Sequence, residues 1–141
     1  MSIRSARSVV AGQAPITAAG TATVLEASVQ MKRQGKGALL VLKEGRLAGI
    51  VTERDIVFRV VALGRDAADI RLDSIMTPQP QTIHPDKPFL HALRMMREGG
   101  FRHLPVVENG RPLGIVSARD ALDDDFFELR AELAQRGGEE Y

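Results

Sequence analysis

Two aspartates follow hydroxyl residues at the same spacing in distant parts of the chain, and this pattern suggests the clearest chemistry. The two segments are Gly49-Ile-Val-Thr-Glu-Arg-Asp55 and Gly114-Ile-Val-Ser-Ala-Arg-Asp120, which lie 65 residues apart. In each, an apolar run with a glycine leads to a hydroxyl residue and then, three positions later, to the aspartate. A strand that leads into a helix N-terminus presents unpaired N–H groups, which suit a phosphate. A short carboxylate such as Asp55 or Asp120 can accept two hydrogen bonds from the vicinal hydroxyls of a ribose.

The same pattern also has a purely structural interpretation. A hydroxyl residue at a helix start with a carboxylate three positions later resembles a capping box, although Glu or Gln is usual at that position. Arg54 and Arg119 recur inside the two segments, and each places a cation beside an exposed helix start. Capping and ligand binding are compatible, so both interpretations stay open.

The two segments belong to a longer internal duplication. Residues 17–55 align without a gap on residues 82–120, and 14 of these 39 positions are identical. A register of this length indicates a tandem duplication. The chain has 141 residues, which fits one compact domain. Because halves of roughly 60 residues would each be marginal alone, we expect them to share one core.

Both halves predict the order helix, strand, strand, helix. In the first repeat we expect a helix over 23–34, strands over 38–42 and 47–51, and a helix over 53–63. In the second we expect a helix from Phe89 to Gly99-Gly100, strands over 103–107 and 113–116, and a helix over 118–135. We expect an N-terminal arm (1–11, a pairing strand or a loose segment), repeat 1 (12–64), a linker (65–76), repeat 2 (77–125) and a C-terminal extension (126–141).

Composition and motifs exclude several classes of function. A net charge of +1 gives no electrostatic case for nucleic acid. Cysteine is absent, so thiolate metal sites and thiol catalysis are excluded. No apolar run has the length of a membrane span and no secretory signal is present, so we expect a cytoplasmic protein. His84, His91 and His103 show no metal-site spacing, and Asp123-Asp-Asp125 fits a solvated face better than a cation site. No nucleophile, GxSxG or Walker motif predicts an enzyme.

The region 12–125 resembles a pair of cystathionine β-synthase-type (CBS) domains, often called a Bateman module. The resemblance rests on the two repeated segments, on Phe101-Arg-His-Leu-Pro-Val-Val107, and on Ser74-Ile-Met-Thr-Pro78. It implies an α/β (α+β) fold of two β-α-β-β-α units packed through their small sheets. It also implies a non-catalytic regulatory module that binds AMP, ADP, ATP, NAD(H) or S-adenosylmethionine between the repeats. The sequence does not indicate which protein it would regulate.

The resemblance also implies roles for individual residues. Each aspartate of the repeated segments would accept hydrogen bonds from a ribose, and each hydroxyl residue would contact phosphate or ribose oxygens. Adenine would be contacted largely by backbone, and each cleft would take its adenine-contacting loop from the opposite repeat. The candidate nucleotide-binding residues are Thr17, Gly37, Ala38, Thr52, Arg54, Asp55, Thr82, Arg102, His103, Ser117, Arg119 and Asp120.

The two copies are not equivalent in charge. Arg102-His103 aligns with Gly37-Ala38, so only the second repeat carries cations where its strand begins. We therefore expect the site with Ser117 and Asp120 to hold phosphate better, although repeat 1 has the more usual form of the motif. The structural alternative for Arg102 is a solvated surface residue, and for His103 a packed residue.

An apolar stripe on the last helix predicts self-association. Its members are Ala121, Leu122, Phe126, Leu129 and Leu133. The family commonly pairs head to head, so we expect a homodimer through helices 53–63 and 118–135. The alternative function is a structural dimerisation module with no physiological nucleotide, and the alternative for the stripe is that it covers its own core.

Overall fold

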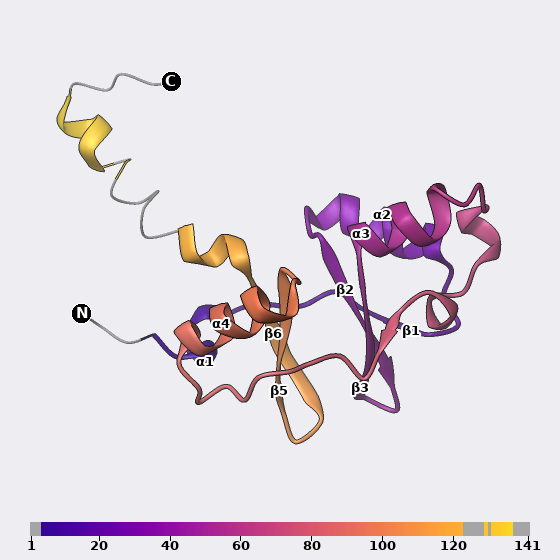
Figure 1. Cartoon of the computed structure of the whole chain (residues 1–141), viewed down its shortest axis with the longest axis horizontal. Coiled ribbons are helices and arrows are strands. Elements are labelled where there is room, and N and C mark those ends of the chain that lie inside the picture. The colour runs from indigo at the N-terminus through magenta and orange to yellow at the C-terminus, as the bar shows by residue number, and fades with distance from the viewer. Residues whose placement is uncertain (1–3, 123–128, 130, 137–141) are drawn as a thin grey trace.

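The computed structural model describes residues 4–122, 129 and 131–136. The chain forms two α+β halves that lie side by side, each with a small sheet and helices packed on it (Figure 1). The first half contains β1 (Thr17–Ala19), α2 (Val24–Gln34), β2 (Ala38–Lys43), β3 (Arg46–Thr52) and α3 (Glu53–Ile56). The second contains α4 (Phe89–Gly99), β5 (His103–Glu108) and β6 (Arg111–Ser117). The duplication and the mixed α+β fold predicted from sequence are confirmed.

The two sheets differ in size. In the first, the strand order is β1-β2-β3-β4, where β4 is the short segment Thr77–Pro78 that joins the edge of β3. Strand β1 runs parallel to β2, and β2 pairs with β3 in antiparallel fashion. The second sheet contains β5 and β6 alone, and a single parallel bridge from Ile83 to Val106 stands in place of the first strand.

The predicted helix ends and hairpin turns are confirmed by the backbone. Helix α2 begins after Thr23, whose hydroxyl accepts a hydrogen bond from Glu26 N, and it ends at Gly35 with φ of 62°. The turn between β5 and β6 places both Asn109 and Gly110 at positive φ, as a two-residue hairpin requires. The glycine of each repeated segment also has a packing role. A side chain at Gly49 would overlap Met76, and one at Gly114 would lie 2.7 Å from Val10 Cβ.

The region predicted as a linker, 65–76, contributes to the first core. Leu72 and Ile75 are almost completely buried and Ile70 is 6% exposed, together with residues of α2, β2 and β3. The segment contains two 3₁₀ turns, Ala67–Asp69 and Leu72–Ser74. Backbone hydrogen bonds from Leu72 N to Ala22 O and from Val24 N to Ile70 O fix it against the start of α2. Its polar composition concealed these buried positions.

The N-terminal segment forms a helix, where the sequence suggested a strand or a loose arm. Helix α1 (Ala6–Val10) is capped by Ser5, whose hydroxyl oxygen accepts a hydrogen bond from Ser8 N. Ala6 and Val10 are buried in the second core, beside α4, β5 and β6. A five-residue helix cannot show a full amphipathic period and has little stability alone. Tertiary contact with the second repeat therefore accounts for it.

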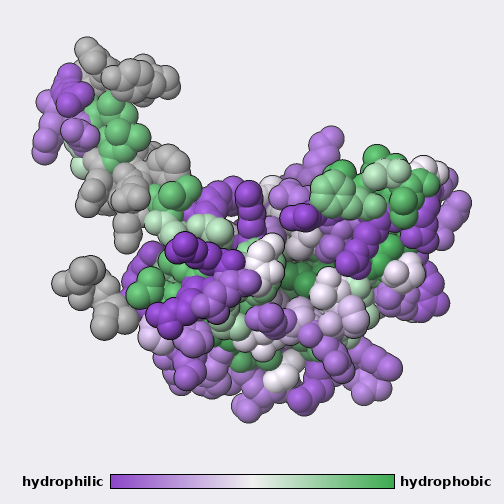
Figure 2. Space-filling view, in the orientation of Figure 1, coloured by the Kyte–Doolittle hydropathy of each residue, from purple (hydrophilic) through white to green (hydrophobic). Residues whose placement is uncertain are grey.

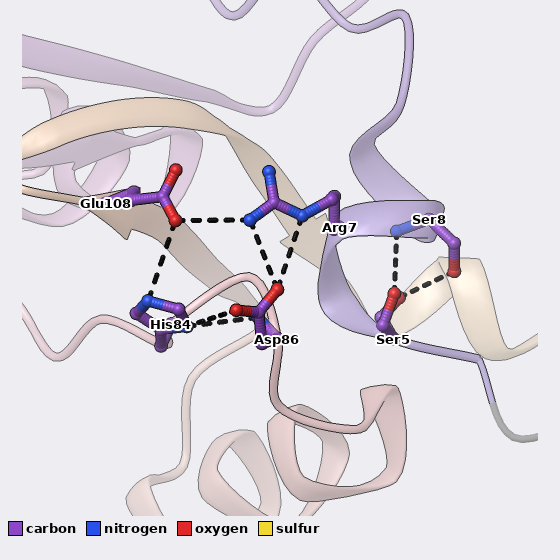
Figure 3. Close-up of polar contacts among 6 residues, drawn as sticks. All are labelled: Ser5, Arg7, Ser8, His84, Asp86 and Glu108. Carbon is purple, nitrogen blue, oxygen red and sulfur yellow. Dashed lines mark hydrogen bonds and ion pairs between the residues drawn. The ribbon is translucent and has the colours of Figure 1, made fainter.

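A cluster of charged side chains holds α1 to the second repeat (Figure 3). The Arg7 guanidinium lies 3.1 Å from both Asp86 Oδ1 and Glu108 Oε2, and these carboxylates raise the pKa of Arg7. His84 lies 3.7 Å from each carboxylate, and His84, Asp86 and Glu108 bring possible metal-ligand atoms within 4.8 Å of one another. The sequence predicted no metal site from the histidines. In the structure Arg7 supplies the cation of this cluster.

The helices that follow the repeated segments deviate from regular α-helices. The helix predicted over 53–63 consists of α3 and a π-helix, Val57–Val61. The helix predicted over 118–135 begins as a 3₁₀ helix, Ala118–Leu122. Helical backbone is present at 129 and 131–135. Residues 123–128 and 130 lie outside the described residues, and they include Asp123-Asp-Asp125 and Phe126 of the predicted stripe. None of the helices in the described part of the chain has the length and apolarity that a membrane crossing requires.

The two repeats are joined through their sheets. Ala38, Leu40 and Ile50 form a third apolar cluster, against which Leu42, Leu47 and Ile115 pack. Leu47 N also donates a hydrogen bond to Gly110 O across the repeats. Apolar contact between the sheets and this hydrogen bond therefore hold the two repeats together.

Candidate functional site

In repeat 1, the strand-to-helix segment forms a complete capping box. Asp55 Oδ2 accepts hydrogen bonds from Thr52 N at 2.8 Å and from Thr52 Oγ1 at 3.1 Å, and Thr52 Oγ1 accepts one from Asp55 N. The other carboxylate oxygen, Oδ1, lies 3.8 Å from Arg59 Nε. The structural interpretation of the motif is thus confirmed for this repeat. The box fixes the orientation of the carboxylate, which is largely buried.

In repeat 2, the equivalent segment makes only part of this arrangement. Ser117 N donates to Asp120 Oδ2 at 2.7 Å, and the helix that follows is a 3₁₀ helix. Among the described residues, Asp120 Oδ1 has neither a hydrogen-bond partner nor an ion-pair partner. One oxygen of Asp120 therefore orients the side chain and the other stays available to a ligand.

Asp120 lines the larger of two cavities, which has a volume of about 970 Å³. Three segments of repeat 1, within 13–16, 28–38 and 53–57, line it together with the repeated segment of repeat 2. The lining residues of repeat 1 include Gln13, Ala14, Pro15, Ile16, Lys32, Lys36, Gly37, Ala38 and Glu53. Those of repeat 2 include Arg102, His103, Ile115, Ser117, Ala118, Arg119 and Asp120.

Asp55 lines the smaller cavity, which has a volume of about 540 Å³. From repeat 1 it is lined by Ile50, Thr52, Glu53, Arg54 and Asp55. From the range predicted as repeat 2 it is lined by Thr77, Pro80, Gln81, Gly100, Phe101, Arg102 and His103. Both volumes fall within the range of roughly 300–1,000 Å³ that small-molecule sites occupy. Each cavity thus combines the aspartate of one repeat with the strand entry of the other, which is the arrangement that the resemblance implied for a ligand cleft.

Ten of the twelve candidate residues line at least one cavity. The exceptions are Thr17 and Thr82, which are exposed and contribute to neither lining. The residues just before them contribute instead, with Pro15 in the larger cavity and Pro80 in the smaller. These two prolines are also 65 residues apart. Extending the repeat upstream by two residues would have found them.

The larger cavity has an excess of positive charge, and only Arg102 and Arg119 among its cations were predicted from the sequence. Lys32, Lys36, Arg102 and Arg119 line it, against Glu53 and Asp120. Within the part of the chain that the structure describes, none of these four cations has an ion-pair partner within 4.0 Å. Lys32 lies near the end of α2 and Lys36 just beyond it, and the folded chain places this end of α2 at a cavity that repeat 2 also lines. No linear motif marks these two lysines.

The smaller cavity is balanced in charge. Arg54 and Arg102 line it with Glu53 and Asp55, and the Arg54 guanidinium lies over the Phe58 ring at 5.2 Å from its centroid. Asp55 has Arg59 beside its second oxygen. Both features reduce the positive charge available to an anionic ligand here.

His103 lies partly buried between the two cavities, and its environment lowers its pKa from the ordinary value of 6.5. Burial is the main cause, because it disfavours the charged ring. Arg119 and Arg102 lower the pKa further, whereas Glu53 and Asp120 act in the opposite direction. The neutral ring is therefore favoured near neutral pH, and an anion placed beside it would favour the protonated form.

Two duplicated α+β units, each contributing an oriented aspartate to a cleft built with the other, define a tandem CBS pair. The family model for the CBS domain matches residues 7–62 and 69–125. The chain belongs to the CBS domain family.

Curated relatives extend beyond the region shared with this chain. The chain is 34% identical over 116 residues to the CBS domain-containing protein CBSX3, mitochondrial, of Arabidopsis thaliana. The alignment covers 79% of this chain and 56% of that protein. The chain therefore spans less than two thirds of the length of this relative.

Solved structures similar to this one include two complexes with adenosine compounds. The CBS domain protein PAE2072 from Pyrobaculum aerophilum, complexed with AMP, superposes with a TM-score of 0.78 at 28% identity, covering 94% of this chain and 99% of that one. The CBS domain pair of protein MJ0100, in complex with 5-methylthioadenosine and S-adenosyl-L-methionine, gives 0.80 at 26%, covering 90% and 99%. The hexameric CBS-CP12 protein from bloom-forming cyanobacteria gives 0.78 at 32%, covering 89% and 74%.

Proposed function

We propose that this chain is a non-catalytic regulatory module that binds one adenosine-containing ligand in its larger cavity. The observation that carries the proposal is the state of Asp120. One of its oxygens is held by Ser117 N at 2.7 Å, the other has no hydrogen-bond or ion-pair partner among the described residues, and Asp120 lines a cavity of about 970 Å³ that both repeats line. A fixed carboxylate with an available oxygen suits a ribose, since both hydroxyls of the sugar are donors.

Each part of such a ligand has suitable partners in this cavity. Gly37 and Ala38 would offer backbone groups to adenine, beside the Glu53 side chain that lies against Gly37. Arg102 and Arg119 offer guanidinium groups to phosphate, and guanidinium–phosphate hydrogen bonds are among the stronger ones in proteins. Ser117 adds a hydroxyl. AMP, ADP, ATP, NAD(H) and S-adenosylmethionine remain the candidate ligands, and the cationic excess favours the phosphorylated ones.

The smaller cavity is proposed as the weaker site. Thr52 and Asp55 would play the parts of Ser117 and Asp120, with Arg102 and His103 at the adenine end. Asp55 already has three hydrogen bonds or ion contacts through Thr52 and Arg59. A ribose would have to compete with Arg59 for the second carboxylate oxygen.

Regulation would follow from the position of the ligand between the repeats. A ligand that contacts Asp120 in one repeat and Gly37 in the other favours the relative arrangement in which both contacts form. Such differential binding shifts the population of a two-state element. The regulated protein is a partner of unknown identity, and the cytoplasm is the compartment proposed from sequence.

A specific observation favours self-association as a second function. Val57, Phe58, Val61 and Leu63 are 49–66% exposed, and hydrophobic surface gathers over the end of α3 and the residues after it (Figure 2). Leu122 and Leu129 are each 46% exposed, whereas Ala121 of the predicted stripe packs against the second core. We propose that the face with Phe58 and Val61 forms a homodimer, with or without ligand.

Thermal shift tests the binding function. AMP, ADP, ATP, NAD, NADH and S-adenosylmethionine are each added in excess, and at least one should raise the melting temperature by mass action. The double variant Asp55→Asn, Asp120→Asn should abolish the shift, because the negative charge that strengthens the hydrogen bonds to the ribose is lost. The fold should be retained, because the Asn side-chain oxygen can still accept a hydrogen bond from the backbone N–H. A flat response to every ligand would leave dimerisation as the better account.

Sedimentation tests the second function. The wild-type chain should sediment as a dimer at micromolar concentration, and Phe58→Glu with Val61→Glu should return it to a 15.4 kDa monomer. Arg111→Glu, on the exposed hairpin of the second sheet, is the matched control and should stay dimeric. A monomeric wild type, or a larger assembly unaffected by the Phe58 and Val61 changes, would contradict this interface.

A further inference from the structure

Three charged or titratable side chains line both cavities. They are Glu53, Arg102 and His103, and they are called here the shared wall. Glu53 is the first residue of α3 in repeat 1, whereas Arg102 and His103 stand at the entry to β5 in repeat 2. The shared wall therefore combines both repeats at the place where the two cavities adjoin.

The backbone arrangement that builds the shared wall is the same in both repeats. Glu53 N donates a hydrogen bond to Gly37 O at 3.0 Å, and Ala118 N donates one to Arg102 O at 3.0 Å. The two bonds are related by the repeat offset of 65 residues. Each helix start is thus tied to the strand entry of its own repeat.

The side chains on this arrangement are not repeated. Repeat 1 has Glu53 on its helix start where repeat 2 has Ala118, and repeat 2 has Arg102 and His103 where repeat 1 has Gly37 and Ala38. The Glu53 carboxylate occupies the space beside Gly37, since a Cβ placed on Gly37 would lie 3.1 Å from Glu53 Oε1. The two cavities consequently share Arg102 and His103.

This shared set constrains what both cavities can hold together. Arg102 is exposed and has no ion-pair partner within the described part of the chain, so its guanidinium is available to either cavity. A phosphate bound in one cavity would neutralise part of the charge that it offers to the other. A second phosphate across the shared wall would meet a cation already engaged, the first phosphate, and the Glu53 carboxylate. Like charges placed in adjoining cavities repel, and they do so more strongly near partly buried groups such as His103 than in bulk water. An uncharged adenosine ligand meets none of these three costs.

We propose that the shared wall is a single anion subsite serving both cavities, so that the chain holds one phosphorylated adenosine ligand at a time while uncharged adenosine occupies both. This inference rests on the proposed function and specifies it. A ligand in one cavity that places its phosphate on the shared wall lowers the affinity of the other cavity for a second phosphorylated ligand. The module would report the phosphorylated ligand through one cavity alone.

Calorimetric titration of the full chain with AMP and with adenosine tests the inference. AMP should bind at one molecule per chain, with any second molecule at least about tenfold weaker, which corresponds to 1.4 kcal/mol. Two adenosine molecules should bind per chain, and the affinities of the first and second adenosine should differ less than those of the first and second AMP. Arg102→Gln should weaken AMP at least about tenfold and leave adenosine within twofold. Glu53→Gln should strengthen the second AMP step.

Two control variants separate the shared wall from general electrostatics. Arg119→Gln removes a cation that lines the larger cavity alone, and it should weaken the first AMP step without changing the second. Arg97→Gln removes an exposed cation on α4, away from both linings, and should change neither step. If Arg97→Gln weakened AMP as much as Arg102→Gln, overall charge would explain the result and the shared wall would be rejected.

A second readout is proton uptake, measured by repeating the titrations at pH 7 in buffers of different ionisation enthalpy. His103 faces Glu53 and Asp120 as well as Arg102 and Arg119, and its pKa lies below 6.5 in the empty protein. A phosphate beside the ring would raise that pKa. AMP binding should therefore be accompanied by proton uptake at His103, whereas adenosine binding should not. The phosphate of AMP also titrates near neutral pH and contributes its own proton exchange. His103→Gln should remove the part of the proton uptake that the phosphate does not account for.

The outcomes distinguish this inference from the proposed function. Two AMP molecules bound with equal affinity, while adenosine also binds twice, would overturn the shared subsite and leave the nucleotide-binding function intact. Equal weakening of AMP and adenosine by Arg102→Gln would do the same, because it would mean that Arg102 contacts the nucleoside. Absence of binding by both ligands would overturn the proposed function and this inference with it.

Discussion

The two repeats share a backbone arrangement but differ in the side-chain hydrogen bonds at their helix starts and in the size of their sheets. Repeat 1 has a complete capping box, in which Thr52 and Asp55 satisfy each other, and a four-stranded sheet. Repeat 2 has a two-stranded sheet covered by α1 and makes only the bond from Ser117 N to Asp120. Repeat 2, whose helix start has fewer capping hydrogen bonds, therefore keeps more of its polar groups available to a ligand.

The largest expected effect concerns the first core. Leu72→Ala should lower the free energy of unfolding by about 2–5 kcal/mol, because a completely buried leucine would leave a cavity. Urea denaturation measures it, with Leu90→Ala, a side chain that is 68% exposed, as the control. A loss below about 0.5 kcal/mol would mean that the segment after repeat 1 is a linker after all and does not belong to its core.

The next effect concerns the capping difference between the repeats. Thr52→Ala should cost about 1 kcal/mol of stability, since its hydroxyl both accepts from Asp55 N and donates to Asp55 Oδ2. Ser117→Ala should cost only a few tenths, because the bond to Asp120 comes from the backbone N–H of Ser117. Parallel urea denaturation of the two variants gives the comparison. Equal losses would show that the two segments are capped alike.

The smallest expected effect is the pH dependence contributed by His103. Because its pKa is lowered in the folded protein, unfolding takes up a proton between the folded pKa and the unfolded value of about 6.5. The stability contributed by the neutral ring is present above pH 6.5 and is lost as the pH falls below it. His103→Gln should flatten the stability profile between pH 8 and 5. An unchanged slope in that variant would assign the pH dependence to other groups.

Much of the fold could be predicted because local chemistry and tertiary structure agree. The glycines after α2 and α4 adopt positive φ at the helix ends, and Asn109-Gly110 forms the predicted hairpin. The wholly apolar run Ala38–Leu42 corresponds to a strand covered on both sides, as expected. At these positions the residue type alone restricts the backbone.

The rest depends on contacts between distant segments. Helix α1 is too short to be recognised without the second core that buries Ala6 and Val10. The linker contributes Leu72 through hydrogen bonds to the start of α2. Of the candidate site, the two aspartates and Arg102-His103 at the start of β5 followed from the repeat. Lys32 and Lys36 contribute only because the fold places the end of α2 at a cavity that repeat 2 also lines. No spacing rule within one repeat contains that information.

The most direct measurement of the central claim compares the two aspartates by AMP titration calorimetry. We expect Asp120→Asn to lower the affinity of the first AMP at least about tenfold, because a charge-assisted hydrogen bond to a ribose hydroxyl is lost. Asp55→Asn should change that affinity less than about twofold. Wild-type affinity in Asp120→Asn, or a larger loss in Asp55→Asn, would contradict the assignment of the larger cavity as the principal site.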